Sequence, residues 1–142
     1  MSVKYILYNP LSCNGKGTEL AQKLTEIYKD DELKYCNMTQ ISGYGTFFDS
    51  ISPESDIVLC GGDGTLNRFI NDSDGYPYEN PLYYYGTGSG NDFLRDLGKE
   101  QGCEPVRINE YVRNLPIVTV NGKSSRFINA ICAVSYTHLT LP

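Results

Sequence analysis

The chain has 142 residues, of which 40% are hydrophobic and 20% charged, so it is long and apolar enough for one globular domain with a core. Its formal net charge of −5 argues against nucleic acid as a partner and against strong attraction to anionic lipid. No apolar run approaches the roughly 20 residues that span a bilayer, and the N-terminal residues lack the pattern of a signal peptide, so we expect a cytoplasmic protein.

Predicted strands and helices alternate through the first part of the chain. Residues 3–8 predict a strand, and a loop over 9–17 follows it. Thr18 then suits the N-cap of an amphipathic helix over 18–30. Residues 33–38 predict a second strand, which Thr39 follows directly. The pattern over 43–51 is ambiguous and allows a short helix.

The middle of the chain repeats this alternation. Residues 56–60 are a continuous apolar run, typical of a strand buried on both faces, and they lead directly into Gly61-Gly62-Asp63-Gly64-Thr65. A helix is predicted from Leu66, and residues 72–75 close it. Residues 81–85 predict the next strand, which ends in a second glycine-rich stretch.

A short helix is predicted after this second glycine-rich stretch. Asn91 or Asp92 suits its N-cap, and Gly98 suits its C-terminal end. Strand and helix therefore alternate to about residue 104, which favours a three-layer, Rossmann-like α/β domain with a parallel sheet.

The pattern changes beyond Pro105. Antiparallel strands are predicted over 106–108, 117–120 and 126–128, with a hairpin turn at Asn121-Gly122. We therefore place a domain boundary near residue 104. Residues 1–104 are predicted to form the α/β domain, and residues 105–133 the beginning of an antiparallel β-sandwich.

Residues 134–142 resemble one reading frame of the transposase adapter used in short-read sequencing. Such a tail should be set aside before the fold is considered. We therefore expect the natural protein to continue past Ala133, and we do not include His138, the single histidine, in any candidate site.

The five cysteines are scattered at positions 13, 36, 60, 103 and 132. No two of them have the Cys-x-x-Cys spacing of a metal or redox site. The odd count also argues against a closed set of disulfides, so we interpret them as free thiols that behave as small hydrophobic residues.

Loops that leave the carboxyl ends of parallel strands form the binding crevice of an α/β sheet. The predicted loops over 9–17, 61–65 and 86–92 are each followed by a predicted helix. Glycine lets the backbone approach a bulky anion and present N–H groups to it, and a helix N-terminus adds favourable partial charge. The sequence therefore predicts a phosphate-binding site.

The usual phosphate motifs do not fit these loops. Gly15-Lys16 is followed by glycine rather than serine or threonine, and the other glycine spacings differ from that of a dinucleotide fold. Asp63 would repel phosphate unless magnesium or a ligand hydroxyl compensates its charge. A tight turn with Thr65 as helix cap is the structural alternative, but the second glycine-rich loop argues against it.

Residues 61–67, Gly-Gly-Asp-Gly-Thr-Leu-Asn, resemble the signature shared by diacylglycerol kinases, sphingosine kinases, NAD kinases and 6-phosphofructokinases. Residues 86–95 are similar to the second signature of the diacylglycerol kinase branch. Asn9-Pro10 with Gly15-Lys16-Gly17 resembles the opening loop of that branch, and residues 126–129 its entry into the second domain. The resemblance covers nearly all of residues 3–132. Cys13 departs from it, since many relatives have glycine there.

The resemblance implies a role for each matching residue. Residues implied to bind ATP are Asn9, Pro10, Asn14, Thr39, Gly61, Gly62, Asp63, Gly64, Thr65, Asn67 and Thr87. Those implied to line the cleft where lipid and phosphate meet are Gly86, Gly88, Gly90, Asn91 and Asp92. Asp63 would lie near Mg²⁺. In this family the catalytic base belongs to the second domain.

The resemblance implies an ATP-dependent lipid kinase that converts diacylglycerol, or a related lipid, to phosphatidic acid, with peripheral membrane contact. We expect the 142-residue chain to supply the nucleotide-binding half and to be inactive alone. An NAD kinase-like enzyme and a non-catalytic nucleotide-binding module are the alternatives. The stretch over 86–92 argues against NAD kinase, and the adapter-like tail argues against a module that ends naturally here.

Overall fold

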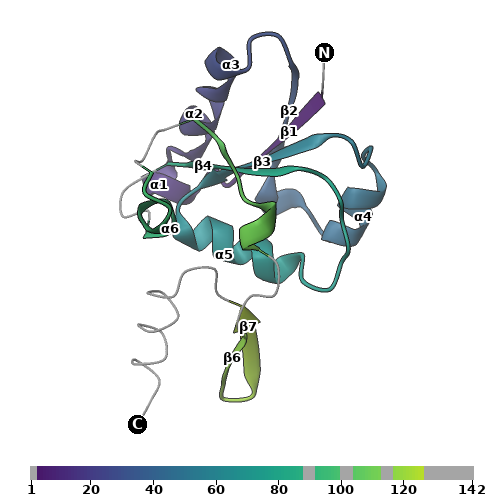
Figure 1. Cartoon of the computed structure of the whole chain (residues 1–142), viewed down its shortest axis with the longest axis vertical. Coiled ribbons are helices and arrows are strands. Elements are labelled where there is room, and N and C mark those ends of the chain that lie inside the picture. The colour runs from purple at the N-terminus through teal and green to yellow at the C-terminus, as the bar shows by residue number, and fades with distance from the viewer. Residues whose placement is uncertain (1–2, 88–91, 100–103, 113–116, 127–142) are drawn as a thin grey trace.

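The computed structural model describes residues 3–87, 92–99, 104–112 and 117–126 (Figure 1). Strands and short helices alternate along most of this length, as the sequence predicts. The elements are β1 Val3–Tyr8, α1 Ser12–Gly15, α2 Gly17–Gln22, α3 Leu24–Ile27, β2 Glu32–Asn37, η1 Met38–Gln40, α4 Tyr44–Asp49, β3 Asp56–Gly61, α5 Asp63–Asp72, β4 Leu82–Gly86, α6 Asp92–Asp96, β5 Val106–Arg107, η2 Asn109–Tyr111, β6 Ile117–Val120 and β7 Lys123–Arg126.

The central sheet has five strands in the order β2-β1-β3-β4-β5. The first four are mutually parallel, and β5 runs antiparallel to β4. The sheet therefore crosses the boundary expected near residue 104, because Val106 and Arg107 pair with Tyr84 and Tyr83. These two residues had been assigned to the second domain. The division into domains otherwise remains a prediction.

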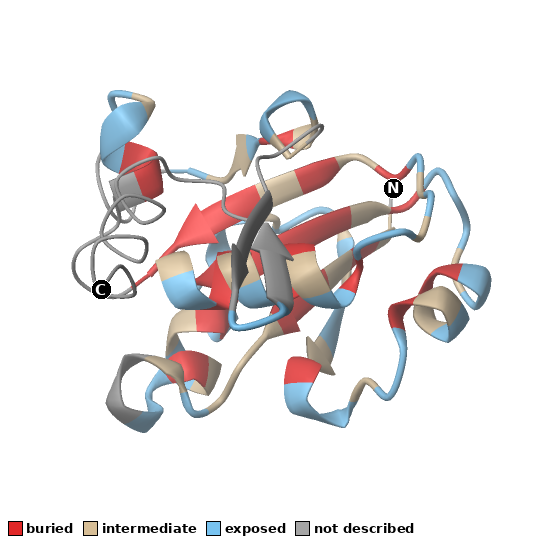
Figure 2. Ribbon diagram, turned by 90° about the horizontal axis from the view of Figure 1, so that it is seen from below, coloured by how far each residue is buried: buried red, intermediate tan, exposed pale blue. Residues whose placement is uncertain are grey.

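The sheet has helices on both faces, so the predicted three-layer arrangement is present (Figure 1). On one face α2 and α3 cover a small cluster built from Ile6, Ala21, Leu24, Val58, Cys60 and Tyr85. On the other face α4, α5 and α6 cover the larger core. Buried residues concentrate in the central strands (Figure 2), and β3 is buried along almost its whole length, as its apolar run predicts.

The helix predicted over 18–30 is instead two short helices, α2 and α3. It begins at Gly17, so Thr18 lies inside the first turn rather than at the cap. Gly17 fits under the preceding loop, where an added Cβ would lie 1.9 Å from the Asn9 carbonyl oxygen. This close approach sets the start of the helix. At the other end, α3 stops at Ile27 because Tyr28 leaves the helical conformation.

Two short segments also differ in detail from the sequence prediction, and a third agrees with it. Strand β2 ends at Asn37, whose side-chain oxygen accepts the Thr39 N–H and begins η1. Helix α5 begins at Asp63 rather than Leu66, with Gly62 at the N-cap position. Helix α6 ends as predicted, since Gly98 has φ +75° and the Lys99 N–H bonds the Leu94 carbonyl at 2.8 Å.

The amino end of the sheet is held together by charged and aromatic side chains. Lys4 of β1 lies 2.5 Å from the Asp56 carboxylate of β3, and both side chains are largely buried. The Lys4 ammonium also lies 4.7 Å from the ring centre of Tyr28 and 5.9 Å from that of Tyr83. Rings in such positions attract a cation, which adds to the ion pair.

An aromatic stack closes the same end of the sheet on its other face. The Phe48 ring lies parallel to the rings of Tyr76 and Tyr78, with centroid distances of 5.5 and 4.5 Å. Beside it, the Asn80 amide donates to the carbonyls of Ser52 and Ser55. The loop before β3 and the loop before β4 are therefore joined.

The predicted hairpin is present between β6 and β7. Its second strand covers Lys123–Arg126 rather than the predicted 126–128, and residues 127 and 128 lie outside the described part of the chain. Asn121 and Gly122 have φ values of 51° and 79°, the left-handed pair that a tight two-residue turn requires. The hairpin lies below α5 in Figure 1. It does not establish the predicted β-sandwich, which stays a prediction, and residues 134–142 lie outside the described part of the chain.

Candidate functional site

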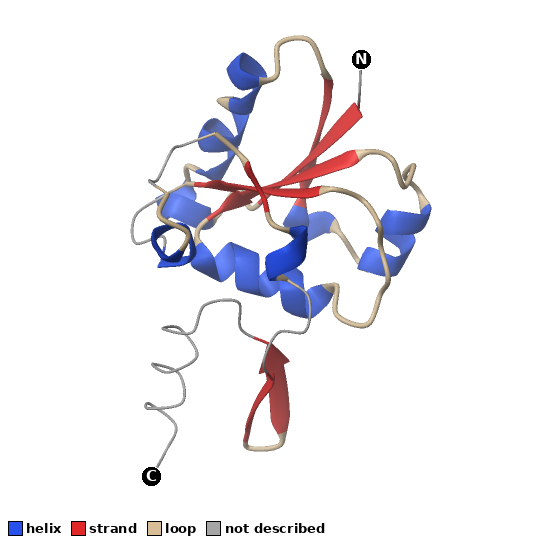
Figure 3. Ribbon diagram, in the orientation of Figure 1, coloured by secondary structure: helices blue, strands red, loops and turns tan. Residues whose placement is uncertain are grey.

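The predicted binding loops lie along one edge of the sheet. Because β2, β1, β3 and β4 are parallel, their carboxyl ends meet at the same edge (Figure 3). Chain order reverses between β1 and β3, since β2 lies on one side of β1 and β3 on the other. Such a switch point is where ligands bind in open α/β sheets. The fold thus brings the three glycine-containing loops together.

The loop after β1 is ordered by Asn9. Its side-chain oxygen accepts the Leu11 N–H at 2.9 Å, and its carbonyl accepts the N–H and hydroxyl of Ser12 at 3.1 and 2.7 Å. Pro10 lies within this turn, and Asn14 lies in α1. The loop is therefore pre-formed at the end of β1, as a binding loop should be.

Thr39 lies at the end of the neighbouring strand. Tyr8 of β1 pairs with Asn37 of β2, so the residues that follow each strand reach the same edge. The N–H and hydroxyl of Thr39 both bond the Asn37 side chain, at 2.9 and 2.6 Å. Thr39 is exposed there, and its contact with nucleotide remains a prediction.

Gly61 is required by the fold itself. Its φ is +156°, and an added Cβ would lie 2.5 Å from the Thr65 Cβ. Its carbonyl accepts the Thr87 N–H at 3.0 Å and the Tyr84 hydroxyl at 2.9 Å. Thr65, expected to bind nucleotide, is buried against this glycine, so its side chain also has a packing role.

The two following glycines are not required in this way. A Cβ on Gly62 would first meet the Thr87 carbonyl oxygen at an ordinary 3.7 Å, and a Cβ on Gly64 would meet no atom of the described residues within 4 Å. Gly64 is exposed in the first turn of α5. Glycine in a helix costs roughly 0.5–1 kcal/mol relative to alanine. The fold gives no reason for that cost, whereas a ligand close to the backbone would.

The N-terminus of α5 points its backbone donors at this edge. Its N-cap residue is Gly62, whose conformation is extended and which offers no side chain to bond the first N–H groups. Uncapped N–H groups at the start of a helix bind anions, and α5, at ten residues, is the longest helix among the described elements.

Asp63 joins the first glycine loop to α6. Its Oδ1 accepts the Phe93 N–H at 3.2 Å, across 30 positions of sequence. The sequence suggested magnesium or a ligand hydroxyl as its partner, and this amide was not foreseen. Over the residues that the structure describes, no three His, Cys, Asp or Glu side chains cluster as metal ligands. The metal role of Asp63 remains a prediction.

The second loop is described at its two ends. Gly86 is the last residue of β4 and pairs with Gly61, and Thr87 is buried beside it. Gly88, Gly90 and Asn91 lie outside the described residues, and Asp92 is the first residue of α6. Asn67 is half-buried in α5, one turn beyond Asp63, where its carbonyl accepts the Asn71 amide.

Tyr84 was missed as a residue of this site. It lies in the Tyr83-Tyr84-Tyr85 run of β4. Its ring is fully buried and its hydroxyl reaches the Gly61 carbonyl. A buried tyrosine needs a hydrogen-bond partner, and that requirement was the available signal.

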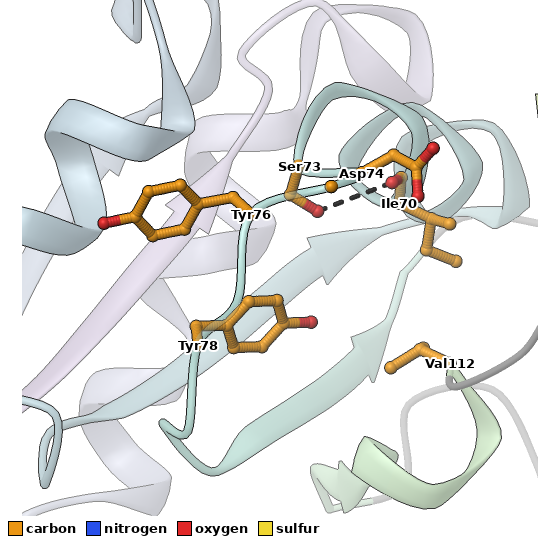
Figure 4. Close-up of a pocket in the computed structure, with 7 residues that line it drawn as sticks. Ile70, Ser73, Asp74, Tyr76, Tyr78 and Val112 are labelled. Atoms are coloured by element: carbon orange, nitrogen blue, oxygen red, sulfur yellow. Dashed lines mark hydrogen bonds between the residues drawn. The ribbon is translucent and has the colours of Figure 1, made fainter.

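A cavity of about 220 Å³ lies at the other end of α5 (Figure 4). Tyr78 points its hydroxyl toward Ile70 and Val112, and Tyr76 points away to bond Asp49. This cavity lies near the amino end of the sheet, away from the glycine loops. It is therefore separate from the candidate site.

The model of the diacylglycerol kinase catalytic domain family matches residues 4–120. The chain belongs to this family. The matched region contains the three loops at the sheet edge and the β6 strand of the hairpin. The matched family is that of the catalytic domain of diacylglycerol kinases.

Two similar solved structures both come from Bacillus anthracis str. Sterne and are described as "a putative diacylglycerol kinase". One is 24% identical, with a TM-score of 0.48 over 71% of this chain and 37% of its own. The other is 22% identical, with a TM-score of 0.49 over 87% of this chain and 45% of its own. The chain thus spans less than half of either neighbour.

No curated protein matches it. Along the described parts of the chain, no helix combines the length and apolar character needed to cross a bilayer.

Proposed function

We propose that the chain supplies the nucleotide-binding half of an ATP-dependent lipid kinase. The full enzyme would transfer the γ-phosphoryl group to a hydroxyl of diacylglycerol, or of a related lipid, to give phosphatidic acid. The carrying observation lies at Gly62 and Gly64, beside the uncapped N-terminus of α5. An added Cβ would make only an ordinary contact at Gly62 and would meet no described atom within 4 Å at Gly64, so the fold requires glycine at neither position. Family membership favours ATP as the ligand beside these glycines.

Each loop would contact a different part of ATP. The backbone N–H groups of Gly62 to Thr65 would bond the phosphates, with favourable charge from α5. The ordered turn at Asn9, Pro10 and Asn14, together with Thr39, would hold the nucleoside. Asn67, one turn further along α5, and Thr87, beside Gly61, would complete the pocket.

Magnesium suits this arrangement. Proteins bind Mg²⁺ through one or two carboxylates together with substrate phosphates, and Asp63 provides a carboxylate beside the phosphate loop. When bound, the ion would neutralise charge on the transferring phosphoryl group. Asp63 and the backbone donors of α5 would hold nucleotide and ion in place.

The acceptor lipid would meet the phosphate beside the second loop, over Gly86, Gly88, Gly90, Asn91 and Asp92. The catalytic base would come from the second domain, whose proposed beginning lies after β5 within residues 105–133. Phosphoryl transfer requires nucleotide, metal and acceptor to be held in line, and half a cleft cannot do this. The enzyme would work in the cytoplasm, in peripheral contact with the membrane that holds its substrate.

Nucleotide binding is the first test. Calorimetric titration of the chain with ATP and Mg²⁺ should show binding, and Gly64→Ala should weaken it at least about tenfold, because a methyl group would enter the phosphate space. Gly43→Ala is the matched control, since Gly43 is an exposed N-cap glycine of α4 with equally open space around it. Equal weakening by both substitutions, or none by either, would contradict the proposed site.

Substrate class is the second test. A protein that carries the second domain should convert diacylglycerol in vesicles to phosphatidic acid with ATP and Mg²⁺, and the 142-residue chain should not. Turnover of diacylglycerol by the 142-residue chain would contradict the proposal that catalysis requires the second domain. Phosphorylation of NAD instead of lipid would favour the NAD kinase alternative, and ATP binding without transfer to either acceptor would favour a non-catalytic module.

A further inference from the structure

The two glycine-rich loops are joined by two sets of contacts, one at the Gly61 carbonyl and one at the Asp63 carboxylate. The Gly61 carbonyl accepts the Thr87 N–H at 3.0 Å and the Tyr84 hydroxyl at 2.9 Å, which fixes the start of the second loop. A contact between the Asp63 carboxylate and the Phe93 N–H, at 3.2 Å, fixes its far end. The second loop is therefore tied to the first at both ends.

The contact at the far end is physically favourable. Phe93 is the second residue of α6, and the first N–H groups of a helix have no acceptor within the helix. A carboxylate at this position bonds the donor and also suits the partial positive charge of the helix end. Asp63 thus acts on α6 as a capping residue does, but from a distant part of the chain.

The Phe93 side chain adds a packing contact to this connection. It is almost fully buried, and its ring meets the Tyr84 ring edge-on with a centroid distance of 5.7 Å. Tyr84 in turn bonds Gly61. Backbone and side chain of Phe93 are thus both attached to the first loop, one through Asp63 and the other through Tyr84.

We propose that Asp63 is a positioning residue, whose carboxylate holds α6 in a fixed place beside the nucleotide loop. The contact between Asp63 and α6 does not depend on the proposed function; only the expected effect of Asp63 on ATP affinity rests on it. The acceptor oxygen and the negative charge of Asp63 are separable, because asparagine keeps the oxygen without the charge and alanine keeps neither.

The test compares Asp63→Asn with Asp63→Ala in the complete 142-residue chain. Amide exchange at Phe93 is followed by NMR, and ATP affinity by calorimetry with and without Mg²⁺. Asp63→Ala should speed Phe93 exchange about tenfold, as expected for a lost hydrogen bond to a charged group, and Asp63→Asn by much less. The alanine variant should also bind ATP several-fold more weakly than the asparagine variant, because only asparagine keeps α6 in place beside the nucleotide loop.

The control is Asp72→Asn, which removes the same charge from the exposed far end of α5 and should leave Phe93 exchange unchanged. Unchanged exchange in Asp63→Ala, or equal acceleration in both Asp63 variants, would overturn the positioning role. Equal ATP affinities of the two Asp63 variants would also overturn it. If exchange responds as expected but the wild type does not bind ATP, the attachment of α6 stands and the proposed function fails.

Discussion

The two ends of the central sheet are built from different interactions. At the amino end, side chains make the contacts: Lys4 pairs with Asp56, and Phe48 lies between two tyrosine rings. At the carboxyl end, glycines form the turns and expose backbone groups, including the N–H groups at the start of α5. The comparison indicates that the amino end mainly stabilises the fold, whereas the carboxyl end leaves backbone groups available to a ligand.

Breaking the ion pair at the amino end should have the largest effect on stability. Asp56→Ala leaves the largely buried Lys4 ammonium without its carboxylate partner, and we expect a loss of about 3 kcal/mol in the free energy of unfolding, measured with urea. Asp72→Ala, which breaks an exposed pair with Arg68, should cost under about 1 kcal/mol. Similar losses for the two variants would show that burial does not distinguish the pairs.

A methyl group at Gly61 should have the next largest effect. Gly61→Ala places a Cβ 2.5 Å from that of Thr65, and we expect a loss of about 2 kcal/mol in unfolding free energy. Gly62→Ala is the adjacent control, since its Cβ makes an ordinary contact, and it should stay within about 0.5 kcal/mol of the wild type. If both substitutions destabilise equally, the steric distinction between these glycines is wrong.

Alkaline pH should weaken the aromatic region near the amino end. Burial, with a smaller contribution from nearby Asp72, raises the pKa of Tyr44 from its ordinary 10 to about 12. Below pH 10 its contribution is fully present, because tyrosine is neutral in both states. Between pH 10 and 12 the unfolded chain ionises first, so stability falls with rising pH by roughly 1 kcal/mol per unit from this group.

Tyr44→Phe checks this assignment by urea unfolding across that pH range. The variant keeps the ring against Phe69 and should lose less stability per pH unit than the wild type. Some decline should remain, because burial also raises the pKa values of Tyr28 and Cys60. Identical slopes for variant and wild type would show that Tyr44 does not titrate differently in the two states.

The smallest expected change in stability has the opposite sign. Gly64→Ala should increase the free energy of unfolding by about 0.5 kcal/mol, because alanine favours helix and its methyl group meets no neighbour among the described residues. The same variant should bind ATP more weakly. A decrease in stability would show that the fold needs glycine here, and would remove the main argument for a ligand at this position.

Local patterns predicted the elements that depend on local causes. The apolar run over 56–60 marked β3, and Asn121-Gly122 marked the hairpin. The start of α5 was placed three residues late, because glycines at 62 and 64 have low helix propensity and hide the first turn. Strand β5 was assigned to the wrong sheet, since two residues carry no signal for their partner strand.

The candidate site shows the same limit. Its motif residues could be listed from the sequence, and the parallel sheet brings their loops to one edge. The bond between Asp63 and Phe93 joins positions 30 apart, and the Tyr84 hydroxyl reaches a carbonyl on another strand. Such contacts depend on which strands are neighbours, so no local spacing predicts them.

The unequal surroundings of Gly61 and Gly64 also bear on how this family diverges. Selection for folding alone would keep glycine at position 61, where a side chain collides with Thr65, but would let position 64 drift toward better helix formers. A relative that has given up its ligand should therefore retain the first glycine and lose the later one. Under the proposed function, the residue aligned with Gly64 would mark descendants that no longer bind nucleotide.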